Sequence, residues 1–190
     1  MRTTNSDRVL KTTIWGIGRK GTWLAVIVTA LAAFAPVQAS KAPKTLEEQV
    51  RHELVMLPYY SVFDELSFQV KGNSVVLAGK VTRPVLRSDA ENVVKRIPGV
   101  ADVDNRIEVL PLSRFDDRIR LAELRAVYGN SALFRYNLGA IPAIRIIVRN
   151  GDVTLEGVVA SQMDKNIAGL AANTVAGVFS VTNNLQVKSL

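Results

Sequence analysis

The sequence predicts an α+β protein made of two tandem units of one design, each with the element order helix-strand-strand-helix-strand. The first observation is an internal repeat: residues 72–109 align without a gap on residues 150–187, and ten of the 38 aligned positions are identical. The second is that each copy switches from apolar residues at alternate positions to apolar residues at helical spacing. We therefore expect in each unit a mixed three-stranded sheet with two helices on one face.

Residues 1–39 have the features of a secretory signal peptide. A basic start is followed by a short apolar run at 23–34, by Pro36, and by a small-x-small pattern that ends at Ala39. The apolar run is too short for a comfortable membrane span, so we expect cleavage near Ala39 and a periplasmic or secreted protein. An uncleaved N-terminal anchor is the alternative. Residues 40–44 are predicted to be a linker.

The charge argues against a nucleic-acid partner. The whole chain has a formal net charge of +7, but residues 40–190 keep 19 basic and 16 acidic residues, a net charge of +3. That excess is too small to favour binding to a phosphate backbone. The chain has no cysteine. We therefore expect a fold without disulfide bonds and without a lipid anchor on a cysteine.

The first unit is predicted at residues 45–110. A Thr-x-x-Glu capping box at Thr45 starts a helix, which Pro58 ends. Apolar residues then alternate along two strands around a tight turn, and a second helix begins at Pro84. Residues 103–109 alternate again and form the third strand.

The second unit is predicted at residues 113–188. Its first helix is offset by 69 residues from that of the first unit and its later elements by 78, so about nine residues are inserted near 125–143. Asn150-Gly151 predicts a tight hairpin because both turn positions favour positive φ. Ser161 starts the last helix with a second capping box. Units of this size are marginal alone, so we expect the two to pack on each other.

Three repeated pairs of residues are interpreted as structural: Gly79 and Gly157, Gly99 and Gly177, Asn105 and Asn183. The first pair faces the helices, where close helix-on-strand packing needs a small residue; a phosphate cradle is the alternative. The second pair stops the helices. The third pair places an amide on an apolar face, and we expect it to bond backbone groups of the turn or of the neighbouring strand. A ligand role is its alternative.

The repeated motifs, taken in order, resemble the BON domain of bacterial osmotic-stress and nodulation proteins. They are Val-Val-Leu-Ala-Gly-Lys-Val at 75–81 and Ile-Pro-Gly-Val-Ala-Asp-Val-Asp-Asn at 97–105, with counterparts at 153–159 and 175–185. The resemblance covers nearly all of the chain after the leader. It implies a non-catalytic protein that binds phospholipid or the membrane surface in the periplasm and protects the cell envelope.

The inserted segment holds the main candidates for binding. Aromatic side chains beside an arginine suit a lipid headgroup boundary or a protein interface. The alternative is a loop that packs its aromatic rings over the second sheet. Two further arginines on the outer face of that sheet add to an anionic-surface site or are simply solvated. The candidate residues are Tyr128, Phe134, Arg135, Tyr136, Arg145 and Arg149.

Nothing in the sequence indicates catalysis, a cofactor, a metal or a small-molecule substrate. His52 is the single histidine and has no ligand cluster around it in the sequence. Acidic pairs at 47–48 and 116–117 begin helices, where the helix dipole favours them. We predict an envelope protein that binds an anionic phospholipid surface and supports stress tolerance. The alternative is a protein-protein interaction module of a periplasmic or outer-membrane complex.

Overall fold

The computed structural model describes residues 45–139 and 141–188, which lie within one compact unit, residues 42–190. The predicted signal peptide and its cleavage site near Ala39 lie outside the described residues. Within the described ranges, no helix is both long enough and apolar enough to cross a membrane.

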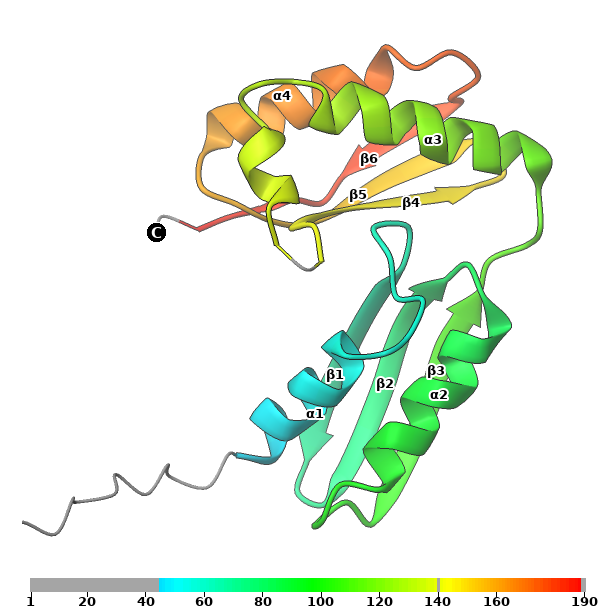
Figure 1. The fold of residues 1–190 in the computed structure, drawn as a ribbon, viewed down its shortest axis with the longest axis vertical. Coiled ribbons are helices and arrows are strands. Elements are labelled where there is room, and N and C mark those ends of the chain that lie inside the picture. The colour runs from blue at the N-terminus through cyan, green and yellow to red at the C-terminus, as the bar shows by residue number, and fades with distance from the viewer. Residues whose placement is uncertain (1–44, 140, 189–190) are drawn as a thin grey trace, which may run out of the picture. The chain divides into compact units, whose positions relative to one another are not determined.

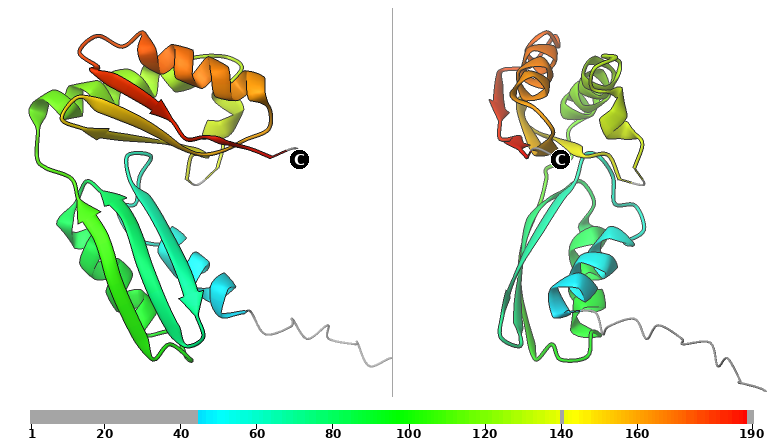
Figure 2. Two further views of the ribbon diagram at one scale, coloured as in Figure 1. Left: turned by 180° about the vertical axis from the view of Figure 1, so that it is seen from behind. Right: turned by 90° about the vertical axis from the view of Figure 1, so that its left-hand side faces the viewer.

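The first domain has the predicted element order (Figure 1). Its elements are α1 (Leu46–Val55), β1 (Glu65–Lys71), β2 (Ser74–Val81), α2 (Pro84–Lys95) and β3 (Asp102–Val109). β1 and β2 are antiparallel, whereas β2 and β3 are parallel, so the sheet has the order β1-β2-β3. Both helices cover the same face of this sheet (Figure 2). The predicted α+β architecture is confirmed.

The second domain repeats this order with one addition. Its elements are α3 (Arg114–Tyr128), the 3₁₀ helix η1 (Phe134–Asn137), β4 (Ile144–Arg149), β5 (Asp152–Val159), α4 (Gln162–Asn173), β6 (Ser180–Asn183) and β7 (Gln186–Val187). β4 pairs antiparallel with β5, and β6 and β7 both pair parallel with β5. The last strand, expected to be continuous, is therefore split into two short strands around Leu185, which stays buried.

The signals at the starts of α1 and α2 and at the β4–β5 hairpin are confirmed, whereas Ser161 caps α4 through its side chain alone, without the reciprocal bond of a capping box. Thr45 makes a complete capping box with Glu48, and Pro84 is the first residue of α2. Asn150 and Gly151 have φ of 52° and 86°, so the β4–β5 hairpin turns through the two positive-φ positions that the sequence predicted.

The reason for the strand glycines differs from the one we expected. Gly79 and Gly157 have φ of 133° and 126°. An added Cβ would lie 2.1 Å from the carbonyl oxygen of Glu65 or 2.0 Å from that of Ala143. The close neighbour is thus the backbone at the start of the adjacent strand, not a helix. The pair Gly99 and Gly177 lies in the turns after α2 and α4, as expected for helix stops.

The partners of the repeated asparagines also differ from the prediction. The side-chain amide of Asn105 donates to the carbonyl of Arg87 on α2 at 2.9 Å, and that of Asn183 donates to the carbonyl of Lys165 on α4 at 2.7 Å. Each amide oxygen accepts the backbone N–H two residues further along. The asparagines therefore tie the last strand to the overlying helix, rather than to the turn or to the neighbouring strand.

The two domains have separate hydrophobic cores and are packed on each other, as expected. The contact is made by the docking loop, residues 57–64, which joins α1 to β1. Its Val62 is 8% exposed and belongs to the core of the second domain. The carbonyl of Val62 accepts the N–H of Ile146 on β4 at 2.9 Å, and Phe63 packs beside it.

Candidate functional site

Two predicted binding residues, Tyr128 and Tyr136, hold the inserted segment in place. Tyr128 is buried, and its hydroxyl donates to the Ile144 carbonyl at 2.6 Å and accepts the Ile144 N–H at 3.1 Å. Burial raises the pKa of Tyr128 to about 12, so the phenol stays neutral. The Tyr136 hydroxyl accepts the Ala160 N–H at 2.8 Å and donates to Asp164 at 2.9 Å. Both rings therefore pack over the second sheet. This is the arrangement that the sequence analysis gave as the alternative to a binding role for the inserted segment.

The charge of Arg135 is neutralised within the domain. Its guanidinium forms an ion pair with the Asp164 carboxylate and donates to the Tyr136 hydroxyl at 3.1 Å. Hydrogen bonds from Ser161 first, and then from Tyr136 and Arg135, lower the pKa of Asp164. Phe134 remains 54% exposed beside this cluster, whose arginine is already paired.

The two arginines of β4 face residues of the first domain. The Arg145 guanidinium carbon lies 5.0 Å from the centre of the Tyr60 ring. Arg149 forms an ion pair with Glu108 at 2.8 Å. Arg149 is therefore already paired, and Arg145 is half-buried against the Tyr60 ring, with its Nη1 atom lacking a hydrogen-bond partner among the described residues.

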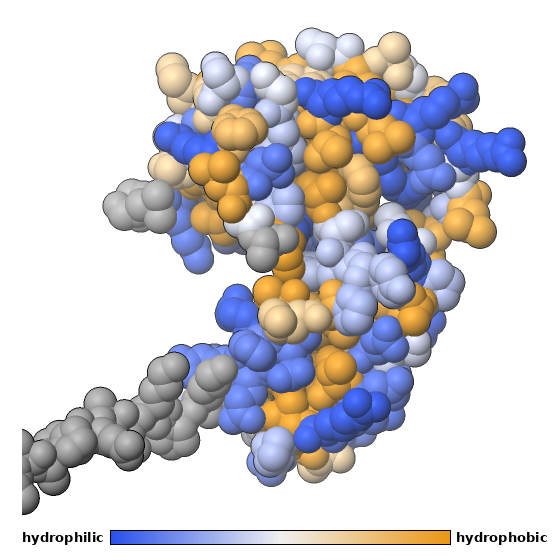
Figure 3. Space-filling model, viewed as in Figure 1, coloured by the Kyte–Doolittle hydropathy of each residue, from blue (hydrophilic) through white to orange (hydrophobic). Residues whose placement is uncertain are grey.

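A different surface, which we name the α3 face, combines exposed arginines with apolar side chains. Three arginines and a leucine on α3 are spaced by four, three and four residues, so they project from the same side of the helix. Two phenylalanines beside them are in ring contact, with centroids 6.0 Å apart. Figure 3 shows hydrophilic and hydrophobic residues side by side over α3. The α3 face consists of Arg114, Phe115, Arg118, Leu121, Arg125 and Phe179.

The positive charge of the α3 face is uncompensated. None of its three arginines forms an ion pair within the described ranges. The acidic residues of the first turn are used elsewhere: Asp116 accepts the N–H groups of Asn150 and Gly151, both at 2.9 Å, and Asp117 pairs with Arg120. From the sequence, this turn is predicted only to be a helix start. The regular spacing of the arginines was the signal that could have found the face.

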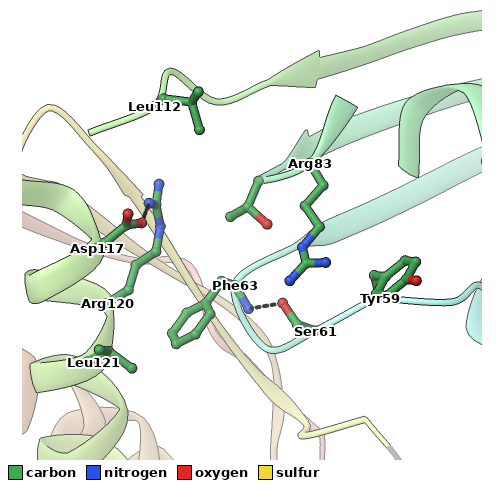
Figure 4. A pocket seen from close by; sticks show the side chains of 9 residues that line it. Tyr59, Ser61, Phe63, Arg83, Leu112, Asp117, Arg120 and Leu121 are labelled. Carbon is green, nitrogen blue, oxygen red and sulfur yellow. Dashed lines mark hydrogen bonds and ion pairs between the residues drawn. The ribbon is translucent and has the colours of Figure 1, made fainter. Parts of the chain in front are cut away.

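A cavity of about 490 Å³ adjoins this helix (Figure 4). The Arg83 guanidinium lies 4.9 Å from the centre of the Tyr59 ring on one side of it. On the other side Arg120 pairs with Asp117 and donates to a backbone carbonyl of β4 at 2.7 Å. The side chains that line the cavity are thus mainly cationic or apolar, and the Asp117 carboxylate among them is paired with Arg120.

The single histidine and a carboxyl group with a strongly raised pKa lie on different helices, α1 and α3. His52 lies on the exposed side of α1 next to Glu53, at 3.3 Å. Glu123 is fully buried in α3, neither of its carboxylate oxygens has a hydrogen-bond partner among the described residues, and burial raises its pKa to about 8. In the same ranges no group of three His, Cys, Asp or Glu residues is placed to hold a metal ion.

The fold is a duplicated α+β unit in which helices cover one face of each mixed sheet (Figure 2). The family model of the BON domain matches the chain twice, at residues 44–111 and 116–189. The chain therefore belongs to the BON domain family, as its repeated motifs predicted.

Two solved structures similar to this chain are both of CdsD, a structural protein of the type III secretion system of Chlamydia trachomatis. The first, its C-terminal domain, is 12% identical with a TM-score of 0.29 and covers 77% of this chain and 99% of its own. The second is 12% identical with a TM-score of 0.28 and covers 76% of this chain and 93% of its own. No curated protein matches this chain.

Proposed function

We propose that this chain is a non-catalytic periplasmic protein that binds anionic phospholipid surfaces through the α3 face and thereby supports envelope integrity under stress. The observation that carries the proposal is the group of three arginines on one exposed side of α3, none of which is in an ion pair with another described residue. Phe115 and Phe179, 38% and 75% exposed, lie beside them. Membership of the BON family supports the same ligand class.

The chemistry of the α3 face matches a negatively charged headgroup layer. An arginine near an anionic bilayer surface contributes about 1 kcal/mol, and this attraction is screened by salt. Aromatic rings on an amphipathic helix enter the boundary between headgroups and acyl chains. The Arg118 guanidinium already lies 5.8 Å from the Phe115 ring, so the cation and the ring approach the surface together. The resulting binding is reversible and weakens as salt is raised.

Vesicle flotation tests the proposal. We expect residues 42–190 to float with phosphatidylglycerol vesicles at low salt, to float less at high salt, and to remain unbound with phosphatidylcholine alone. The variant R114Q/R118Q/R125Q should bind on the order of 100-fold more weakly, since three contributions of about 1 kcal/mol are lost. The variant R83Q/R87Q/R96Q removes the same charge from the first domain and should bind like the wild type.

Flotation also separates the α3 face from the inserted segment that the sequence indicated. The variant F134S/L138S changes two exposed side chains of that segment, and we expect its vesicle binding to be unchanged. Equal loss in both arginine variants would show a response to net charge alone and would contradict the α3 face. No binding to any anionic vesicle would leave the interaction module for an envelope protein as the function to test next.

A further inference from the structure

The outer edge of β4 is covered. In an antiparallel ladder alternate residues turn their N–H and C=O groups away from the partner strand. On β4 these residues are Ile144, Ile146 and Val148. The Tyr128 hydroxyl is hydrogen-bonded to both the N–H and the C=O of Ile144. The Val62 carbonyl accepts the N–H of Ile146 at 2.9 Å, and Arg120 donates to the Val148 carbonyl at 2.7 Å. Two side chains of α3 and a backbone carbonyl of the docking loop thus cover this edge together.

β1 is the counterpart of β4, and its edge is open. The offset of 78 residues puts Leu66, Phe68 and Val70 at the matching positions. The Tyr60 hydroxyl accepts the N–H of Leu66 at 3.3 Å, as Tyr128 does for its counterpart. No described residue is hydrogen-bonded to the edge-facing groups of Phe68 or Val70. An unpaired strand edge is a template for pairing with another segment.

The arginine that covers the β4 edge in the second domain has a counterpart in the first domain that does not cover the β1 edge. Arg51 occupies the position on α1 that Arg120 occupies on α3, at the offset of 69 residues. Arg120 is 5% exposed and bonds the strand, whereas Arg51 is exposed and lies 5.5 Å from the Phe68 ring. A hollow of about 510 Å³ follows β1 between Glu47, Arg51 and the strand. It corresponds to the space that the docking loop and Arg120 fill in the second domain.

In each chain, the docking loop of the first domain covers the β4 edge. The corresponding loop of the second domain and the β1 edge have no such contact with each other among the described residues. The matching loop of the second domain, between α3 and β4, lies in the inserted segment, and its Phe134 and Leu138 are 54% and 72% exposed. We infer that the inserted segment of one copy docks on the β1 edge of a second copy, as Val62 docks on β4.

A second copy is the occupant because this contact repeats an interface that the chain already makes within itself. The internal contact joins unlike surfaces, a loop and a strand edge, so its repetition between copies is head-to-tail rather than two-fold. The backbone hydrogen bond gives affinity and the exposed phenylalanine and leucine enter the hollow, in the manner of strand addition. The inference is independent of the proposed lipid binding, which uses the α3 face.

Sedimentation velocity without lipid tests the inference. We expect the mean mass of residues 42–190 to rise with protein concentration. F134S/L138S removes the apolar groups of the inserted segment, and F68P removes the edge-facing N–H of β1, where an edge strand tolerates proline. Each change should weaken self-association about ten-fold or more, the effect of losing about 1.4 kcal/mol. The control V85S/L170S changes two side chains that are 42% and 69% exposed elsewhere, and it should associate like the wild type.

Mixing the two variants gives the sharpest result. F68P keeps an intact inserted segment and F134S/L138S keeps an intact β1 edge, so the mixture should form a one-to-one dimer and nothing larger. A wild type that stays monomeric at every concentration overturns the inference, as does a folded mixture that stays monomeric. If F68P does not fold, the F134S/L138S variant still decides the question. Self-association of this variant that equals the wild type is then enough to overturn the inference. Because no lipid is present, failure of vesicle binding leaves this result unaffected.

Discussion

Glu123 places an unpartnered carboxyl group in the interior of the second domain, and this makes stability depend on pH. Burial raises its pKa from 4.5 to about 8. The folded state therefore holds the proton where the unfolded chain has lost it, so stability falls as pH rises from about 4.5 through 8. We predict that E123Q is more stable than the wild type at pH 9 by on the order of 5 kcal/mol, and nearly equal to it at pH 4. Urea unfolding at the two pH values measures this.

The repeat supplies a second variant for the same position. Leu54 of α1 corresponds to Glu123 at the offset of 69 residues and is itself buried. E123L should therefore remove the pH dependence and keep the core filled. Glu53 has a side chain that is 44% exposed, so E53Q should follow the wild-type pH curve. A wild-type stability that does not fall between pH 5 and 9 contradicts the assignment.

Among the elements, the docking loop depends on one buried carboxylate for its shape. Asp64 is fully buried, and its two oxygens accept hydrogen bonds from the backbone N–H and hydroxyl of Thr82 and from the same two groups of Ser61, at 2.6–3.0 Å. D64A leaves these donors without partners, so we predict a loss of roughly 3 kcal/mol in the free energy of unfolding. Chemical denaturation measures it.

An exposed aspartate gives the matched comparison for this element. Asp104 pairs with Arg106 on the open side of the first sheet, where an ion pair contributes about 1 kcal/mol or less. D104A should therefore change stability far less than D64A. Similar losses in the two variants would show that the bonds of Asp64 do not hold the loop.

The elements that the sequence predicted are those whose signals come from residues that are neighbours in the chain. The Asn150-Gly151 turn and the Thr45 cap each depend on neighbours in the chain, so the pattern was sufficient. The contact of Val62 with Ile146 joins residues of different domains and has no local pattern. Gly79 was found by its repetition, but its reason was missed because the backbone oxygen near it belongs to another strand. The aromatic residues of the inserted segment do not indicate the α3 face, whose signal is the spacing of three arginines along one helix.

For the whole molecule, the shared core residue Val62 couples the stability of the two domains. A residue of one domain that is packed in the core of the other must leave that core when either domain unfolds, so the domains gain a common transition. Arg149 and Glu108 add an ion pair across the same contact, although their exposure makes its contribution small. We therefore predict one calorimetric transition for residues 42–190 of the wild type.

Breaking the shared contact should separate the transitions. V62D places a carboxylate in the core of the second domain, which costs several kcal/mol unless the docking loop leaves. The loop then detaches, and calorimetry should show two transitions, with the second domain unfolding at the lower temperature because it loses Val62 and the cover of Ile146. V85D adds the same charge at a position that is 42% exposed and should keep the single transition. Two transitions already present in the wild type would show that the domains are energetically independent despite the shared core residue.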